Sequence, residues 1–400
     1  MSVTGKSLGV LGIAVVVAMG VASCGSSGSS AASGSPSTSA SAETWRIGLE
    51  GPLSGSQSAL GKGMLEGAQL AAAQVNANGG VLGRKIEIIP IDDAADPATG
   101  VTAAKQAISG GLSGVVGPYN SAVGAQTLPL YLQAGIVPIR LTSDNSTDGK
   151  GFTLQPMTNQ IAPVTADALG KFYQAKSVGI LYDSTQNYTK STSAAVKKKL
   201  ESAGIKVTSY LPIKPGLASY AKALKQVEAK KPDVIYPAVY YPEGAKIAAE
   251  VTVAPKGQAS VRCLLDYASY DSGYITDAGV ASARNCDVVG VPAPSDFKGS
   301  SAYISAFQSQ FGRPPGTWSP YTYDSLNLLV DGGRKVGGWD ATKLTDFLRT
   351  VTGWNGWTGS VTIEAATGNR VPATVVVTTV DQGGAFHVST AWAKAVAAPY

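Results

Sequence analysis

The sequence predicts an α/β protein of two lobes, each built on a doubly wound, mainly parallel sheet. Short runs rich in Val and Ile alternate with longer stretches rich in Ala, Leu and Lys at helical spacing, which is the pattern of parallel strands covered by helices on both faces. The alternation starts again after a polar stretch at residues 141–160. About 357 residues follow Glu43, more than a single hydrophobic core usually serves, so two lobes are expected.

The first unit alternates strands and helices in a regular order. The strand "TWRIGLE" is followed by a helix at residues 60–76, which the Asn-Gly-Gly of "NANGG" ends, and then by the strand "KIEIIPID". The next helix begins with Asp96 as its cap and Pro97 as its first residue. The strand "GVVGP", a helix at residues 121–133 and the strand "GIVPIR" complete the unit.

The second unit repeats this order and then changes character. A helix at residues 162–175 precedes the strand "SVGILYD", and three more helices alternate with the strands "KVTSYLPI", "DVIYPAV", "VRCLL" and "CDVVGV". Three further helices are expected near residues 303–311, 321–336 and 342–351. From Trp357 on, "GSVTIE", "ATVVVTTV" and "AFHVST" predict antiparallel strands, which can add edges to the parallel sheets.

The first 43 residues predict targeting and tethering. The run at residues 8–22 follows Lys6, is apolar, and is well short of the roughly 20 residues that a membrane span needs. It ends in "VASC", so residues 1–23 are expected to be a lipoprotein signal peptide and Cys24 the lipidated N-terminus; the alternative is an ordinary secretory signal with a chance cysteine. Residues 24–43 are nearly all Ser, Gly, Ala, Thr and Pro and predict a disordered tether.

Charge and cysteine content restrict the partners. The formal net charge is +5 and no basic block occurs, so nucleic acid is not an expected partner. The lipid anchor predicts an extracytoplasmic protein of the bacterial cell membrane, attached through the lipid alone. Under oxidising conditions Cys263 and Cys286, each in a predicted strand, are expected to form a disulfide; two buried thiols are the alternative.

Candidate site residues follow the predicted strands, because ligands of open parallel sheets lie outside the carboxyl ends of the strands. Ser121 is expected to be a helix N-cap, where exposed amides and its hydroxyl would attract an anion; the alternative is that it only caps its helix. Thr142, Ser143 and Asp144 follow the next strand and either contact a ligand or are merely solvated.

The second unit contributes aromatic and acidic candidates. Tyr188 and Tyr240 stand at strand ends, where an aromatic ring can cover the apolar part of a ligand and donate a hydrogen bond. Asp266 directly follows "VRCLL" and would pair with a ligand ammonium; the alternative is a helix cap or a pair with Arg262.

No residue set predicts an enzyme, a cofactor or a metal site. The sole histidine, His387, lies in a late strand pattern and gives a serine triad no base in a plausible loop. There is no His/Cys/carboxylate cluster with zinc spacing, and "DDAADP" is interpreted as a turn and helix cap. The glycine-rich stretch "GPLSGSQSALGKG" lacks the spacing of a dinucleotide or triphosphate loop.

Several stretches carry a family resemblance. "IGLEGPLSG", "GAQLAAAQVNANGGVLGRKIEIIPIDDAADPATGVTAAKQAIS", "GVVGPYNSAVGAQTLPLYLQAGIVPI" and "YYPEGAKIAAE" resemble the substrate-binding proteins of branched-chain amino-acid ABC transporters, over roughly residues 44–380. The resemblance implies a type I periplasmic-binding-protein-like fold with three interlobe crossovers. It further implies one lobe of residues 44–163 plus 294–367 and another of residues 164–293 plus 368–400.

The resemblance also implies roles for single residues. Ser121, with Ala122 beside it, matches the serine that takes the ligand carboxylate at a helix N-terminus, and residues 142–144 match the loop that adds further contacts. Tyr188 and Tyr240 match aromatics that close over the ligand, and Asp266 matches the acid that receives the α-ammonium.

The sequence departs from the family pattern at a few positions, which leaves the ligand open. Leu60 stands where leucine binders have tyrosine, Arg140 and Leu141 replace a Ser/Thr-Pro step, and Ala95 and Asn120 replace cysteines that some relatives pair. The expected function is a monomeric solute-binding lipoprotein of an ABC importer that delivers an amino acid or similar metabolite to permease subunits. The alternative is a surface ligand sensor or envelope regulator without a transport role.

Overall fold

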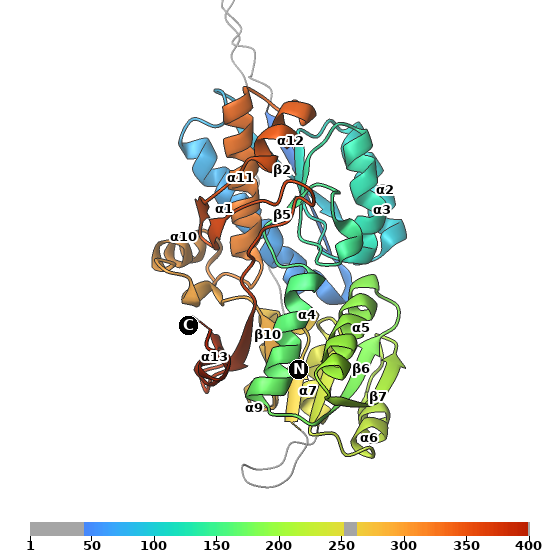
Figure 1. Ribbon diagram of the computed structural model, residues 1–400. Coiled ribbons are helices and arrows are strands. Elements are labelled where there is room, and N and C mark those ends of the chain that lie inside the picture. The colour runs from blue at the N-terminus through green and yellow to red at the C-terminus, as the bar shows by residue number, and fades with distance from the viewer. Residues whose placement is uncertain (1–43, 252–261, 399–400) are drawn as a thin grey trace, which may run out of the picture. The chain divides into compact units, whose positions relative to one another are not determined.

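The computed structural model describes residues 44–251 and 262–398, which form two lobes, each around its own sheet (Figure 1). The first sheet has five strands in the order β2-β1-β3-β4-β5, and the second has seven in the order β14-β13-β10-β9-β8-β6-β7. The predicted α/β class and parallel sheets are confirmed. The predicted signal peptide, Cys24 and the tether lie outside the described residues.

The first sheet is parallel throughout and is covered by long helices. Its strands are β1 (Trp45–Gly51), β2 (Ile86–Asp92), β3 (Gly114–Val116), β4 (Pro138–Arg140) and β5 (Phe152–Thr153). The helices between them are α1 (Ser58–Ala77), α2 (Pro97–Ser109) and α3 (Ser121–Gln133). Asp96 caps α2 by accepting a hydrogen bond from the Thr99 amide at 2.8 Å, as predicted.

A late segment of the chain returns to the first lobe. It contains α10 (Ser301–Phe311), α11 (Ser319–Val336) and α12 (Ala341–Arg349). The Thr322 hydroxyl donates to the Met64 carbonyl at 2.7 Å, and a Cβ at Gly67 would lie 2.2 Å from the Ser319 carbonyl oxygen. Glycine at position 67 therefore permits the close approach of α1 and α11.

The second sheet is mixed. The strands β6 (Ser177–Asp183), β7 (Lys206–Ile213), β8 (Val234–Ala238), β9 (Arg262–Leu265) and β10 (Cys286–Gly290) are parallel. As predicted, late strands add an antiparallel edge, here β13 (Val376–Val380) and β14 (Phe386–Val388). The strand β12 (Gly359–Val361) instead pairs with β11 (Trp354–Gly356) in a separate ribbon.

Helices of the second lobe surround this sheet. They are α4 (Thr158–Asp167), which continues as a π-helix at Ala168–Phe172, α5 (Asn187–Ser202), α6 (Ala221–Glu228), α7 (Glu243–Glu250), α8 (Ser272–Ala278), α9 (Val280–Ala283) and α13 (Thr390–Val396). The chain passes between the lobes after β5, after β10 and between β12 and β13, which gives three crossovers.

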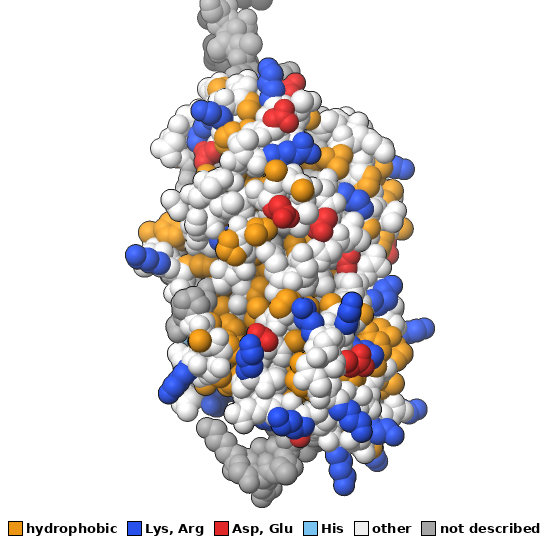
Figure 2. Space-filling view, viewed as in Figure 1, with side chains coloured by type: hydrophobic (Ala, Val, Ile, Leu, Met, Phe, Trp, Pro, Cys, Tyr) orange, Lys and Arg blue, Asp and Glu red, His pale blue; other side chains and the backbone are white. Residues whose placement is uncertain are grey.

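Basic side chains are frequent on the face of the second lobe that Figure 2 displays. Helix α5 alone carries Lys190, Lys197, Lys198 and Lys199, and three of these four are exposed. The Lys197 ammonium pairs with Glu201 at 2.7 Å.

Among residues 44–251 and 262–398, no helix combines the length and the apolarity that crossing a membrane requires.

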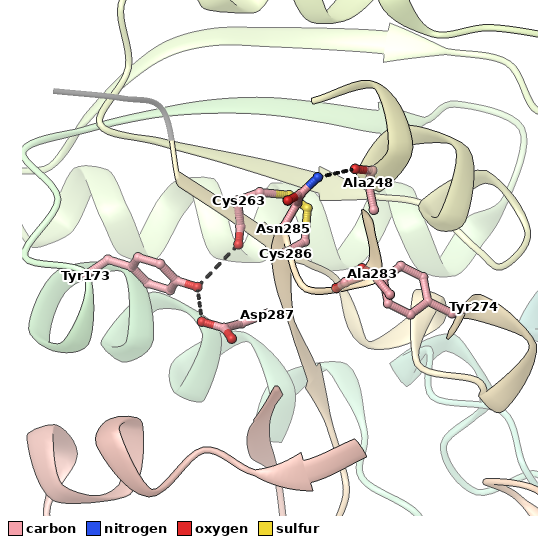
Figure 3. The surroundings of a disulfide bond; sticks show 8 residues. All are labelled: Tyr173, Ala248, Cys263, Tyr274, Ala283, Asn285, Cys286 and Asp287. Atoms are coloured by element: carbon pink, nitrogen blue, oxygen red, sulfur yellow. Dashed lines mark hydrogen bonds between the residues drawn. A yellow bond between two sulfur atoms is a disulfide. The ribbon is translucent and has the colours of Figure 1, made fainter. Parts of the chain in front are cut away.

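The two cysteines lie on neighbouring strands. In the parallel register of β9 and β10, Cys263 is opposite Cys286, and their Sγ atoms are 2.09 Å apart, joined as a disulfide (Figure 3). Beside them, the Tyr173 hydroxyl donates to the Cys263 carbonyl at 3.3 Å and to Asp287 Oδ2 at 2.6 Å. Oxidation of the pair in the exported protein stays a prediction.

Replacing both cysteines tests this bond. The bond closes a loop with a sequence separation of 23 residues, so Cys263→Ser with Cys286→Ser is expected to lower the free energy of unfolding by about 3 kcal/mol. Denaturant melts of the wild type and the double variant, each with and without reductant, measure this loss. If reductant leaves the wild-type melt unchanged and thiol titration finds two free thiols, the pair is not oxidised.

Candidate functional site

A small cavity lies where loops from both lobes meet. Its volume is ≈ 10 Å³, about what one water molecule needs. All the lining residues follow strand ends. They are Tyr119, Leu141 and Ser143 from the first lobe and Tyr188, Tyr240, Tyr267 and Ala268 from the second. The predicted position of the site, at the carboxyl ends of the parallel strands, is therefore where the structure has this cavity.

Five aromatic rings surround this region and contact one another in a closed circuit, which we call the aromatic cage. Successive ring centroids are 5.4–6.5 Å apart, within the range of favourable aromatic pairs. In order around the circuit the rings are Tyr119, Tyr240, Tyr188, Tyr267 and Trp318. Tyr119 and Trp318 belong to the first lobe and the other three to the second, so the cage is complete only when the lobes are together.

Polar contacts also join the lobes beside the cage. The Ser191 hydroxyl, in α5, donates to Asp144 Oδ2 in the loop after β4. The Tyr267 hydroxyl donates to Gln155 Oε1 at 3.2 Å. Asp144 is buried, as are Thr142 and Ser143, so these three residues do not form a merely solvated loop. The structure is thus a closed arrangement of the two lobes.

The N-terminus of α3 faces this contact. The prediction that Ser121 is the N-cap is wrong: Asn120 has the extended backbone of the N-cap position, and Ser121 is the first helical residue. The Ser121 hydroxyl instead accepts a hydrogen bond from the Asp144 amide at 3.2 Å. Burial raises the pKa of Tyr240, carboxylates including Asp266 raise it further, and a hydrogen bond from the Ser121 amide opposes them.

Asp266 is fully buried beside the cavity, although it is not one of the lining residues. Its carboxylate accepts hydrogen bonds from the Ala268 amide at 3.0 Å, from the Thr192 hydroxyl at 3.4 Å and from the Tyr236 hydroxyl. The bond from the Ala268 amide makes Asp266 the N-cap of a short 3₁₀ helix, which is one of the two alternatives given for this residue. The other alternative, a pair with Arg262, does not form, because Arg262 donates to the Tyr173 carbonyl. Burial raises the pKa of Asp266 to about 6.

The remaining predicted residues lie around the site without lining the cavity. Leu60 is buried in α1 and Ala122 is half-buried in the first turn of α3. The Thr142 hydroxyl shares a hydrogen bond with the Thr147 hydroxyl at 2.8 Å and accepts one from the Arg140 guanidinium at 3.3 Å. Of the nine predicted ligand contacts, three line the cavity: Ser143, Tyr188 and Tyr240.

Four neighbours of the cavity were missed from the sequence: Tyr119, Tyr267, Ala268 and Trp318. Tyr119 directly follows a predicted strand, and Tyr267 and Ala268 follow Asp266, so their positions at strand ends could have identified them. Trp318 could not have been found in this way, because it precedes α11 and reaches the cage from the returning segment of the first lobe.

Two lining side chains, Ser143 and Tyr188, carry buried hydroxyls that make no hydrogen bond of ordinary geometry. The Ser143 hydroxyl lies near Tyr267, and the Tyr188 hydroxyl lies near Asp266 and Thr192. A buried polar group without a partner costs about 1–3 kcal/mol, so these two atoms mark places where a ligand atom would be stabilised.

Within residues 44–251 and 262–398, no group of three or more His, Cys, Asp or Glu side chains is arranged to hold a metal ion. His387 is near Asp381 Oδ2 at 3.2 Å and Asp296 Oδ1 at 3.4 Å.

The buried carboxyl of Asp266 predicts a pH dependence of stability. Its folded-state pKa of about 6 lies above the ordinary 3.8, so its burial increasingly disfavours folding as the pH rises from about 4 to about 6. The free energy of unfolding of the wild type, relative to that of Asp266→Asn, should therefore fall by on the order of 2 kcal/mol between pH 4 and pH 6 and change little at higher pH. Denaturant midpoints of both proteins at pH 4, 6 and 8 give the difference. A difference independent of pH would mean that Asp266 is ionised in the folded protein even at pH 4.

Comparisons with known proteins agree with this architecture. Residues 44–385 match a family model described as periplasmic binding protein. The Leu/Ile/Val-binding protein homolog 2 of Brucella abortus (strain 2308) is 25% identical over 322 residues, covering 76% of this chain and 81% of the relative. The leucine-, isoleucine-, valine-, threonine- and alanine-binding protein of Pseudomonas aeruginosa is 27% identical over 328 residues, covering 80% and 86%.

Solved structures share the fold. The branched-chain amino acid transporter substrate binding protein of Streptococcus pneumoniae, in complex with isoleucine, superposes with a TM-score of 0.77 at 22% identity, covering 87% of this chain and 99% of that one. A solute binding protein of Rhodopseudomonas palustris, in complex with 3,4-dihydroxybenzoic acid, gives 0.74 at 19% identity, covering 86% and 96%. One fold therefore accommodates ligands of different chemistry.

Proposed function

The chain belongs to the periplasmic binding protein family, and from this membership we propose that it is an extracytoplasmic solute receptor of an ABC importer. It binds an amino acid or a similar small metabolite between its lobes and delivers it to permease subunits, without chemistry on the ligand. Its relatives are solute-binding proteins, several of them named for amino acids. The receptor acts as a monomer.

The observation that carries the proposal is a cavity whose walls come from different lobes. Tyr119 and Ser143 face Tyr188, Tyr240 and Tyr267 across it. Because opposite walls belong to different lobes, separation of the lobes exposes the site and closure removes water from it, the hinge motion by which two-lobed binders enclose their ligands. The proposed lobes are residues 44–163 plus 294–367 and residues 164–293 plus 368–400.

The size of the cavity requires this motion. A volume of ≈ 10 Å³ is far below the roughly 300 Å³ of small ligand pockets. A ligand thus enters when the lobes separate, and the tyrosine side chains move to accommodate it. The same volume favours the second candidate function, a surface sensor or envelope regulator whose lobes close on each other and signal to a protein partner.

Attachment to the cell membrane through lipidated Cys24 completes the proposal. The expected result of Cys24→Ser is release of the protein from the membrane fraction, measured by fractionation with wild-type protein as the control. A variant that stays with the membrane would contradict a lipid anchor at this residue.

A ligand screen tests the proposed binding. Thermal melts of the full-length protein against amino acids, amides, aromatic acids and sugars are expected to reveal at least one stabilising ligand. At 100-fold excess over its Kd, that ligand stabilises the protein by about 2.7 kcal/mol. Tyr240→Leu should abolish the stabilisation, because it removes a wall of the cavity and of the aromatic cage.

The matched control is Tyr210→Leu. Tyr210 belongs to the same lobe, stacks on Tyr182 with a centroid distance of 4.4 Å, and does not line the cavity. The Tyr210→Leu variant should therefore be stabilised by the ligand as much as the wild type is. A flat response of the wild type across the whole screen would favour the sensor, and equal losses in both variants would place the binding site elsewhere.

A further inference from the structure

Resting on the proposed function, we propose that the ligand is an organic cation whose charged nitrogen is fully alkylated, a quaternary ammonium. The faces of the aromatic cage hold this alkylated ammonium, and Asp266 supplies a buried negative charge behind the rings.

The cage provides the surface that such a cation prefers. Its five rings contact one another in a closed circuit, and tyrosines from both lobes form most of the cavity wall. Four of them line the cavity together with the apolar side chains of Leu141 and Ala268. Aromatic faces attract ammonium groups through their quadrupole, and the attraction strengthens when water is excluded.

The charge around the cage is negative. Asp266 is completely buried, and its hydrogen-bond partners are an amide and two hydroxyls rather than a cationic side chain. Asp144 is 5% exposed and contacts Ser191, and Asp183 is 3% exposed. All three carboxylates act on Tyr240 of the cage and raise its pKa. At short range in a buried site, uncompensated negative charge favours a cation strongly.

The hydrogen-bonding capacity of the site distinguishes an alkylated ammonium from a primary one. A primary ammonium carries three N–H donors, and each needs an acceptor when it is buried. The carboxylate of Asp266 already accepts from three protein donors and does not line the cavity. Among the described lining residues, the buried side-chain oxygen atoms that make no hydrogen bond of ordinary geometry are those of Ser143 and Tyr188. A quaternary nitrogen carries no N–H donor and needs no acceptor, so it leaves these two atoms for a hydroxyl or carboxylate elsewhere on the ligand.

Calorimetric titration of the full-length protein tests the inference with a charged probe and its neutral isostere. Choline and 3,3-dimethyl-1-butanol have nearly the same shape and differ in the charge of the central atom. We expect choline to bind at least about tenfold more tightly. Equal affinities, or binding of neither probe, would overturn the inference.

Three variants locate the cation. Tyr119→Leu removes an aromatic face and should weaken choline binding by about fivefold or more, whereas Tyr119→Phe retains the face and should stay within about twofold of the wild type. Asp266→Asn should reduce the preference for choline over its isostere. Wild-type choline binding by Tyr119→Leu, or a wild-type preference for choline in Asp266→Asn, would overturn the assignment. The Phe variant controls for a loss of folding.

Leucine, in the same titration, separates the failure of the inference from that of the proposed function. Binding of leucine without choline would overturn the alkylated-ammonium class and leave the solute receptor intact. If choline, leucine and the full ligand screen all give no binding, the proposed function fails as well.

Discussion

The closed structure depends on the contact of aromatic rings from both lobes across one small cavity. Tyr119 packs on Tyr240 at 6.1 Å and Trp318 packs on Tyr267 at 5.4 Å, and both pairs join the lobes. Such pairs contribute about 0.5–1.5 kcal/mol each beyond the area that they bury. Part of the energy that holds the lobes together is therefore located at the site itself, so a ligand that enters the site must replace these contacts.

Two further buried carboxyl groups lie in the first lobe, at the ends of strands of the first sheet. Glu50, near the end of β1, and Asp93, just after β2, are both fully buried, and each leaves one carboxyl oxygen without a hydrogen bond. Burial raises the pKa of Asp93 to about 7 and that of Glu50 well above its ordinary value. The Thr127 hydroxyl of α3 donates to Glu50 at 3.2 Å, which ties the helix that begins at the site to the strand beneath it.

The sequence predicted most of the architecture because fully buried parallel strands produce unbroken apolar runs. It missed β5, whose two residues are too few for a pattern, the short elements α8, α9 and β11, and the C-terminal helix α13. At the site, side chains at strand ends such as Tyr188 were predictable from chain order. The N-cap at Asn120 was not predictable, because the backbone conformation decides which residue caps a helix. The position of Trp318 in the cage was not predictable either, because Trp318 lies on the segment that returns to the first lobe late in the chain.

Arg140 connects the site wall to a crossover between the lobes. It is completely buried, and its guanidinium donates to the Thr142 carbonyl at 3.2 Å and to Asn369 Oδ1 at 2.6 Å. Asn369 in turn donates to Asp148 at 2.8 Å and lies on the chain between β12 and β13. A movement of this crossover therefore acts on the loop that carries Ser143 and Asp144. Arg140 thus couples the cavity wall to the segment that joins the lobes, through hydrogen bonds that burial strengthens.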